Sequence, residues 1–545
     1  MDNKALNPAE RGNRSDPVGA DTKEQVFGAG LAITTMVIGV LLALVTTPIL
    51  VHGLGLEGFG RYSLAISVLA VFILFDGGLT NALIRFALPY RAEGTQALFH
   101  FLRGTLPIYL VLLMGLVTTA VCVAVLVLAL GGDASSLSIY ALAVVGAVAT
   151  LLANPFRAIM AVYERFVAAR LMEMLAAIAA AALSIAAVVM GFGAEGAMAG
   201  VVASAFGLLA GRAAYVGIVL RVPLIGAERF KANLAPQSGD EIPRRQRDPS
   251  NNTERRAIIA YALPILATLT VDAAYARVAL FLIAAVLGPS AVALYAVALL
   301  FQKHILRLST AITKVMVPTT LANVDRGVTG SALLHSLCDV ARVQVLLLGP
   351  AVIALAAFGD TFLALWLGPE FAAIHPIMVM IMAAYACDQV GSLRHVVLQA
   401  RGLYWLRARQ AMVIAFVSLS ISLLLMPSLG LMGAALAYTG GLLCSLLAAN
   451  HILSRRAGVQ VKEFYLILAR AAAPALAGAC GVGLAVGAAI PANWWGLFLG
   501  TGVYGVATLT LIWKLGLTKQ ERHTLVSLVI QALPRRWRVP SPQHL

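Results

Sequence analysis

The chain has 545 residues, of which 60% are hydrophobic and only 12% are charged, and its formal net charge is +15. This composition excludes an ordinary soluble domain and is typical of a protein with many membrane-spanning helices. The basic excess does not indicate a nucleic-acid-binding protein, because the sequence has no polar domain that could carry a basic surface. Basic cytoplasmic loops next to anionic lipid explain the charge.

Fourteen apolar stretches are each long enough to cross a bilayer, for which a helix needs about 20 residues. A polar tail, residues 1–25, precedes the first of them. In chain order the predicted spans are 26–52, 61–84, 104–130, 137–160, 170–190, 195–220, 257–287, 289–317, 342–367, 372–396, 408–426, 430–453, 465–490 and 494–516. We therefore expect an all-α polytopic membrane protein.

The gaps between the spans alternate between basic and uncharged. Because Lys and Arg are retained on the cytoplasmic side, we expect the basic gaps, such as the one with Arg85, Arg91 and Arg103, to be cytoplasmic. Arg61 is the only basic residue that this rule places outside. An even number of spans then puts both termini in the cytoplasm, and we expect the protein to lie in the bacterial inner membrane.

Two short patterns recur at nearly the same distance along the chain. They are Leu54-Gly55-x6-Tyr62 with Leu287-Gly288-x6-Tyr295, 233 residues apart, and Gly193–Ala197 with Gly430–Ala434, 237 residues apart. They indicate a six-helix unit that was copied once, although glycine is common enough at helix ends for chance to produce such matches. Two parallel copies would bind a substrate between them.

This duplication predicts an N-lobe at 26–220, a cytoplasmic linker at 221–256 and a C-lobe at 257–455. Two further helices follow at 462–516, and residues 518–545 are expected to form a helix on the inner leaflet and a tail. Within the N-lobe, Gly196 and Gly200 have the GxxxG spacing that allows helices to pack closely.

The sequence lacks the motifs of several enzyme classes. It has no phosphate-binding GxxxxGK[ST], no HExxH and no clustered His and Cys residues, so we expect no metal, no cofactor and no ATP hydrolysis. The outer gaps are also too short to hold the catalytic groups of a glycosyltransferase or polymerase. A transporter is therefore favoured over an enzyme.

Charged residues inside the spans are the strongest functional signal, because a charge that faces hydrocarbon is expensive. In the predicted span at 289–317, Lys303, Arg307, Thr310 and Lys314 fall within about 60° of one another around the helix. The three cations form what we call the basic stripe, which must face water, an anionic substrate or carboxylates. For Lys314, an alternative is that its ammonium group extends to the inner membrane surface.

The predicted span at 257–287 carries one more cation, Arg277, and the carboxylate of Asp272. Asp272 lies at a similar depth to Lys303, so an ion pair between the two is one interpretation. Arg307 would then still lack a counter-charge from these two spans. The other interpretation is that Arg277 and the basic stripe bind an anionic group of a substrate.

Two more carboxylates lie at mid-depth, Asp76 in the span at 61–84 and Asp388 in the span at 372–396. Each could bind a proton or a sodium ion that is coupled to transport, because an ionisable residue within a span marks an ion pathway in many transporters. Each could instead balance the charge of the basic stripe. The sequence leaves both roles open.

Three segments resemble the polysaccharide exporters of the MOP superfamily, the Wzx-type O-antigen and exopolysaccharide flippases. The segments are Pro48-Ile49-Leu50-Val51-x2-Leu54-Gly55-x2-Gly58-Phe59-Gly60-x-Tyr62-x-Leu64, Asp76-Gly77-Gly78-Leu79-x2-Ala82-x2-Arg85 and Pro427-x2-Gly430-x2-Gly433-Ala434-Ala435. The likeness covers the whole chain in topology, but its motifs are loose and consist mostly of helix-turn residues.

The resemblance implies a secondary transporter with two six-helix lobes. Such a transporter turns an undecaprenyl-diphosphate-linked oligosaccharide from the cytoplasmic to the periplasmic leaflet, for O-antigen, capsule or exopolysaccharide synthesis. Its diphosphate carries about two negative charges, which Arg277 and the basic stripe could bind. The resemblance also suggests a polysaccharide polymerase and co-polymerase as partners beside membrane lipid, and it carries over no catalytic residue.

Two alternatives stay open. One is a cation-coupled multidrug exporter of the MATE branch of the same superfamily, although such a protein should present carboxylates rather than a basic stripe to cationic drugs. The other is a non-transport component of a polysaccharide assembly complex, which no feature of the sequence excludes.

Overall fold

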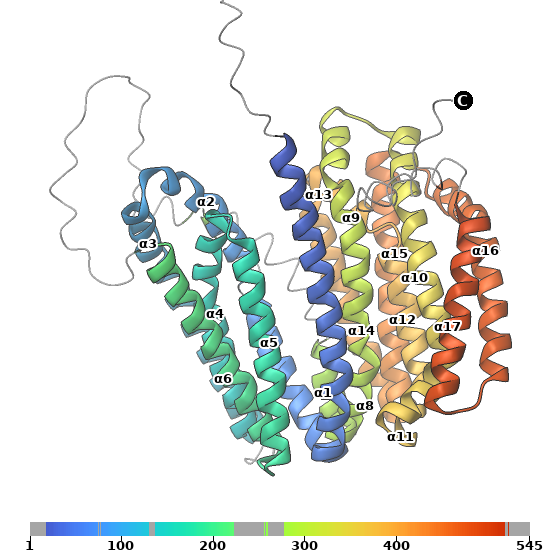
Figure 1. The fold of residues 1–545 in the computed structure, drawn as a ribbon, viewed down its shortest axis with the longest axis horizontal. Helices are drawn as coiled ribbons and strands as arrows, with labels where there is room; N and C mark the ends of the chain where they lie inside the picture. The colour runs from blue at the N-terminus through green and yellow to red at the C-terminus, as the bar shows by residue number, and fades with distance from the viewer. Residues whose placement is uncertain are drawn as a thin grey trace, which may run out of the picture. The chain divides into compact units, whose positions relative to one another are not determined.

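The computed structural model describes residues 18–74, 76, 78–129, 137–222, 256, 258–259, 277–517 and 522, and every regular element in this part of the chain is a helix (Figure 1). Eleven of these helices are long and apolar enough to cross a membrane, or twelve if one bent pair counts as a span. The predicted class, an all-α polytopic membrane protein, is confirmed.

Several predicted segments lie mostly outside the described residues. Of the predicted span at 257–287, the structure describes the helix Arg277–Leu287 and two residues near its start, and Asp272 is not among them. The predicted linker at 221–256 and the predicted interfacial helix at 518–545 are likewise almost wholly outside the described part.

The chain divides into two compact units, of which the first comprises the described residues of Met1–Ile49 and Phe75–Leu263. Its helices are the first part of α1 (Val18–Leu74), α2 (Leu79–Glu93), α3 (Thr95–Ala129), α4 (Leu137–Val162), α5 (Phe166–Val189) and α6 (Gly193–Ala214), which continues into a π-helical turn, Tyr215–Val219. The closely packed pairs are α5 with α6, α4 with α6, and α2 with both α3 and α4. Leu83 of α2 and Tyr109 of α3 share one buried core, which joins these helices.

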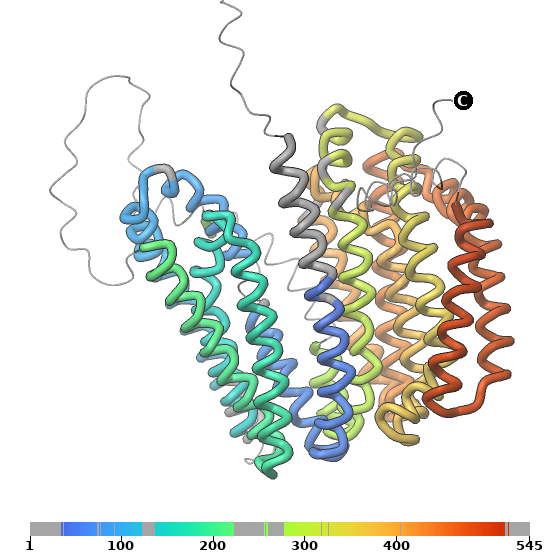
Figure 2. The backbone as a smooth tube through the Cα atoms, viewed as in Figure 1, coloured from blue at the N-terminus to red at the C-terminus, as the bar shows by residue number. Residues whose placement is uncertain are grey.

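The second unit comprises Leu50–Leu74 and the described residues of Pro264–Leu545. After Arg277–Leu287 its helices are α8 (Pro289–Leu300), α9 (Gln302–Asp325), α10 (Gly330–Leu367), α11 (Pro369–Ala372), α12 (His375–Gln389), α13 (Leu393–Ala400), α14 (Tyr404–Leu429), α15 (Leu431–Ala457), α16 (Val461–Ala489) and α17 (Trp494–Leu511), which ends in a π-helical turn, Ile512–Gly516. Helix α10 packs against α12 and α16, and α15 packs against α12 and α14, as the backbone trace shows (Figure 2). Buried side chains such as Leu337 and Val397 fill the core between α10, α13 and α16.

The first pair of repeated turns has one backbone conformation in both copies. Gly55, which kinks α1, has φ 67° and ψ 176°, and Gly288, which precedes α8, has φ 84° and ψ 173°. This conformation is readily accessible only to glycine. The turn after Gly55 packs closely against the start of α8, since a Cβ on Gly60 would lie 1.9 Å from the carbonyl oxygen of Pro289. This contact helps to explain why Leu50–Leu74, expected in the N-lobe, groups with the second unit.

The second pair of repeated turns joins two antiparallel helix pairs of similar construction. In α5–α6 the hydroxyl of Ser184 donates a hydrogen bond of 2.7 Å to the carbonyl of Ala197, and in α14–α15 the hydroxyl of Ser418 donates one of 2.6 Å to Ala437. A Cβ on Gly200 would lie 2.7 Å from the backbone nitrogen of Ser184. The close approach that the GxxxG spacing predicts is therefore present.

Two predicted spans are broken rather than continuous. The interval between α1 and α2 interrupts the span at 61–84, and α12 and α13, bent by 45°, interrupt the span at 372–396. Glycine is present at both breaks, with Gly391 at φ 76° in the second. A break frees backbone groups that transporters use to line binding sites. Both mid-depth carboxylates, Asp76 and Asp388, lie at these breaks.

Candidate functional site

Asp76 is the centre of a buried polar group in the first unit. It follows α1 and precedes α2 in the chain, and the residue is only 4% exposed. Oδ2 accepts hydrogen bonds from the Thr80 hydroxyl (2.5 Å) and from Nδ2 of Asn154 (2.6 Å), and Oδ1 accepts a longer one from the Tyr109 hydroxyl (3.3 Å). Three helices, α2, α3 and α4, therefore each supply one donor.

All three donors to Asp76 are neutral, and no ion pair to it is found among the described residues. A carboxylate in this setting needs another way to satisfy its charge, because burying an unpaired charge is costly. A proton or a small cation supplies that charge. The charge of Arg157 on α4 also acts on Asp76, but the ion pair of Arg157 is with Glu173, so the geometry suits an ion-binding role of Asp76 better than a role as counter-charge to an arginine or lysine.

The basic stripe lies on the side of α9 that faces away from the core of the second unit. Ile305 and Ile312 pack against the core and, at about 100° per residue, lie opposite the stripe. The side chains of Lys303, Arg307 and Lys314 are exposed. Because α8 and the first half of α9, Pro289–Lys314, are apolar enough to span a membrane, this face must line a space that contains water or a polar ligand.

Arg277 lies near the Lys303 end of the stripe. Nη1 of Arg277 donates a hydrogen bond of 3.4 Å to the hydroxyl of Ser67, and the charges of Arg277 and Arg307 both act on Lys303. Within the described part of the chain, neither Arg277 nor a cation of the stripe has a carboxylate at ion-pair distance. The predicted pair of Asp272 with Lys303 lies outside the described residues and stays a prediction.

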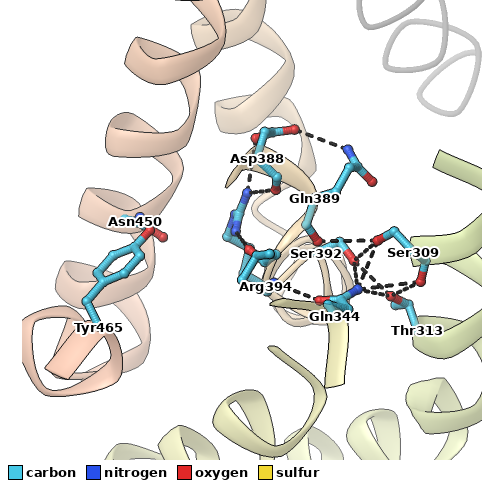
Figure 3. Close-up of polar contacts among 11 residues, drawn as sticks. Ser309, Thr313, Gln344, Asp388, Gln389, Ser392, Arg394, Asn450 and Tyr465 are labelled. Carbon is cyan, nitrogen blue, oxygen red and sulfur yellow. Dashed lines mark hydrogen bonds and ion pairs between the residues drawn. The ribbon is translucent and has the colours of Figure 1, made fainter. Parts of the chain in front are cut away.

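Asp388, the third candidate carboxylate, is paired with Arg394. Nη2 of Arg394 lies 3.0 Å from Oδ1 of Asp388 and also donates to the Asp388 carbonyl, while Nη1 donates to the carbonyl of Val390 (2.8 Å). The Arg394 side chain is 3% exposed. Asp388 thus balances a cation of its own broken span (Figure 3).

A neutral network supports the same break from the other side (Figure 3). Oε1 of Gln344 on α10 accepts a hydrogen bond from the backbone N–H of Gly391 (2.7 Å). Its Nε2 lies 2.9 Å from the hydroxyls of Ser309 and Ser392 and 3.0 Å from that of Thr313. Gln344 and Ser309 are fully buried, so the network anchors α9 and α10 to the point where the span is broken.

The sequence patterns singled out neither Arg394 nor Gln344. Arg394 falls inside the predicted span at 372–396, so the cost of burying a charge was the signal that could have identified it. Gln344 carries no comparable signal, since an amide in an apolar helix is common. Its role depends on which helices pack around it.

The family model described as polysaccharide biosynthesis protein matches residues 27–322, which is more than half of the chain. Among curated proteins, none matches the sequence. The solved structures below share less than 25% identity with it, so their likeness concerns the fold alone.

Lipid II flippase MurJ, in an inward closed conformation, is similar with a TM-score of 0.60 and 11% identity over 92% of this chain and 100% of that chain. An inward-facing multidrug resistance MATE family transporter of the MOP superfamily is similar with a TM-score of 0.54 and 15% identity over 78% and 98%. The eukaryotic MATE transporter AtDTX14 is similar with a TM-score of 0.51 and 13% identity over 84% and 100%. The fold is thus that of MOP superfamily transporters, and the chain belongs to the polysaccharide biosynthesis protein family.

Proposed function

We propose that the protein moves an oligosaccharide linked to undecaprenyl diphosphate across the bacterial inner membrane, from the cytoplasmic to the periplasmic leaflet. Membership of the polysaccharide biosynthesis protein family supports this setting. The observation that carries the proposal is the basic stripe, whose exposed cations lie on one face of a segment long and apolar enough to span a membrane, with the partly buried Arg277 near Lys303. We further propose that both termini are cytoplasmic and that a polysaccharide polymerase and co-polymerase act downstream.

The chemistry of the cations suits a diphosphate. Arginine presents a planar fork of N–H donors that pairs with two phosphate oxygens at once, and lysine adds a mobile point charge. Near a protein surface, the attraction between unit charges 4 Å apart is about 4 kcal/mol, against about 1 kcal/mol in bulk water. Arg277 and Arg307 each repel Lys303, so a diphosphate with about two negative charges relieves that repulsion on binding.

Asp76 supplies the second part of the proposal, coupling to an ion gradient. A buried carboxylate with only neutral donors changes its net charge when it takes up a proton or sodium ion. Its place at a helix break lets that change alter the packing of α2, α3 and α4. Asp388 is less suited to this role, because Arg394 already neutralises it.

The second candidate function is export of cationic drugs coupled to a cation. The buried carboxylate of Asp76 is compatible with it, since a cation site in one unit suits either substrate. The basic stripe opposes it, because exposed cations repel a cationic drug. The two functions therefore predict different effects of removing the basic stripe.

The deciding experiment compares the leaflet distribution of lipid-linked oligosaccharides in a strain that lacks the gene with that in a strain restored by it. We expect diphosphate-linked repeat units to accumulate on the cytoplasmic face without the gene. Lys303→Ala/Arg307→Ala should restore surface glycan at least about tenfold less well than the intact gene, because two charge-assisted contacts are lost. Arg326→Ala is the matched control, since it removes an exposed arginine at the end of the same helix.

A normal leaflet distribution without the gene, in a strain with no second exporter, would contradict the flippase. Increased sensitivity to cationic dyes in that strain would then support the exporter. Full restoration by Lys303→Ala/Arg307→Ala would leave the flippase possible but would remove the stripe from its binding site.

A further inference from the structure

Three arginines of the first unit converge on one glutamate. Oε1 of Glu173 lies 2.8 Å from Nη2 of Arg212 and 3.4 Å from Nε of Arg157, and Oε2 lies 3.6 Å from Nη1 of Arg170. The four side chains come from α4, α5 and the end of α6. One carboxylate thus faces three guanidinium groups, and the cluster has two positive charges in excess among the described residues.

Neutralising the charge of Glu173 does not explain the excess positive charge. A single arginine would balance one carboxylate, and each further cation that is removed from water adds a desolvation cost. Arg212 is almost wholly buried, with 3% of its side chain exposed, and its Nε has no hydrogen-bond partner in the described part of the chain. The charges of Arg157 and Arg212 also repel each other. The cluster is therefore short of negative charge and of acceptors.

The cluster is accessible from water. The side chains of Arg157 and Arg170 are 47% and 52% exposed, and that of Glu173 is 28% exposed. On α5 the exposed apolar residues Leu171 and Leu175 lie about 160–200° around the helix from Glu173. The guanidinium groups therefore gather on a side of α5 that differs from the face suited to hydrocarbon.

The unused donors of the cluster define what it could bind. Arg170 and Glu173 lie beyond the first turn of α5, which begins at Phe166, so the free backbone N–H groups of that helix end add little to the charge of the cluster. Three guanidinium groups offer about fifteen N–H donors in all, of which Glu173 takes only a few. A phosphate group, with several acceptor oxygens and up to two charges, matches both the excess charge and the unused donors.

We propose that Arg157, Arg170 and Arg212 form an oxyanion site for a phosphate or diphosphate group, separate from the basic stripe. Glu173 holds the guanidinium groups together when the site is empty, and the anion takes over part of its contacts. The phosphate belongs either to a soluble or substrate diphosphate or to the headgroup of an anionic lipid. The site is argued from its own contacts and does not depend on the proposed transport.

The test uses the full chain in nanodiscs of phosphatidylcholine, with Lys303→Ala/Arg307→Ala/Lys314→Ala as background so that the basic stripe does not contribute. Inorganic pyrophosphate is titrated by calorimetry, and in a second arm the retention of phosphatidylglycerol is measured by native mass spectrometry. Both arms compare Arg157→Ala/Arg170→Ala with Arg165→Ala, which removes an exposed arginine at the same helix end without contacting Glu173. Arg212 is left intact, because its burial makes a folding defect the first consequence of its loss.

We expect Arg157→Ala/Arg170→Ala to weaken binding about 100-fold, at about tenfold for each charge-assisted contact, and Arg165→Ala to change it less than about threefold. Loss in the pyrophosphate arm identifies a diphosphate, and loss in the lipid arm alone identifies a lipid headgroup. Glu173→Gln should bind at least as tightly as the background, since it removes a competing charge. Equal binding by all variants in both arms, or weaker binding by Glu173→Gln, would overturn the site. Because the readout is binding, a failed glycan-export experiment leaves this result unaffected.

Discussion

Asp76→Asn removes the charge that the coupling proposal needs while it preserves the shape of the side chain. The amide keeps one carbonyl oxygen, which can accept the two short hydrogen bonds that now reach Oδ2 from Thr80 and Asn154. Only the 3.3 Å hydrogen bond from Tyr109 must rearrange, with its hydroxyl turning to accept from the new NH2 group. The expected cost in folding free energy is therefore below about 1.5 kcal/mol, the value of one neutral hydrogen bond.

Asn154→Leu is the matched comparison, because it keeps the charge of Asp76 and removes one of its donors. The 2.6 Å hydrogen bond from Nδ2 reaches a buried carboxylate, and such a bond contributes about 1.5–3 kcal/mol. We expect Asn154→Leu to lower the unfolding temperature of the detergent-solubilised protein more than Asp76→Asn does. Asn154→Leu should thus have the larger effect on stability, and Asp76→Asn the larger effect on transport.

Transport is measured as the delivery of lipid-linked oligosaccharide to the periplasmic leaflet in a strain that lacks the native gene, at matched protein abundance in the membrane. We expect Asp76→Asn to reduce delivery by at least about tenfold, since an ion-coupled step that is worth 1.4 kcal/mol or more is lost. Wild-type delivery by Asp76→Asn would refute the assignment of Asp76 to coupling. Unfolding of Asp76→Asn at or below the temperature of Asn154→Leu would refute the account of its hydrogen bonds.

Three further changes test the packing that positions these groups, each read as the unfolding temperature in detergent. Gly200→Leu should destabilise α5–α6 by about 1–3 kcal/mol through overpacking, whereas Gly207→Leu on the same helix, where a Cβ meets nothing within 4 Å, should not. Gly55→Ala should cost about 1–3 kcal/mol through backbone strain alone, with the helical Gly115→Ala neutral or stabilising. Gln344→Leu should cost about 1–3 kcal/mol, because it leaves the buried N–H of Gly391 without its acceptor, whereas the neighbouring hydroxyls keep other hydrogen bonds. A neutral Gly200→Leu or Gln344→Leu would contradict the corresponding contact, and a neutral Gly55→Ala would contradict the backbone conformation of the kink.

The glycines show which features of the fold can be predicted from short sequence patterns. The spacing of Gly55 and Gly288 predicted two equivalent turns, and their backbone angles agree, because a turn conformation that only glycine adopts is encoded within a few residues. The spacing of Gly196 and Gly200 allowed a close helix contact for a different reason, because glycines on one helix face have no side chains to keep a neighbouring helix apart. What these patterns did not predict is that the turn after Gly55 packs against Pro289 in the second unit.

The candidate site was predicted less completely than the fold. The cost of burying charge identified Asp76, Asp388 and the basic stripe, but it did not tell which charges have partners. Asp76 has three neutral donors and Asp388 has Arg394, although the two carboxylates look alike in sequence. The difference arises from rotation and depth of neighbouring helices, which hydrophobicity along the chain does not determine.

The sequence by itself determined that the chain is a polytopic membrane protein, where most of its helices lie and on which faces its intramembrane charges project. These properties are local, because transfer of a helix into hydrocarbon depends on about 20 consecutive residues and the helical period sets the faces. Only the tertiary structure decided the breaks in two spans, the donors of Asp76, the network around Gln344 and the three arginines on Glu173. Each of these joins helices that are far apart in the chain, and their contacts follow from how the helices pack.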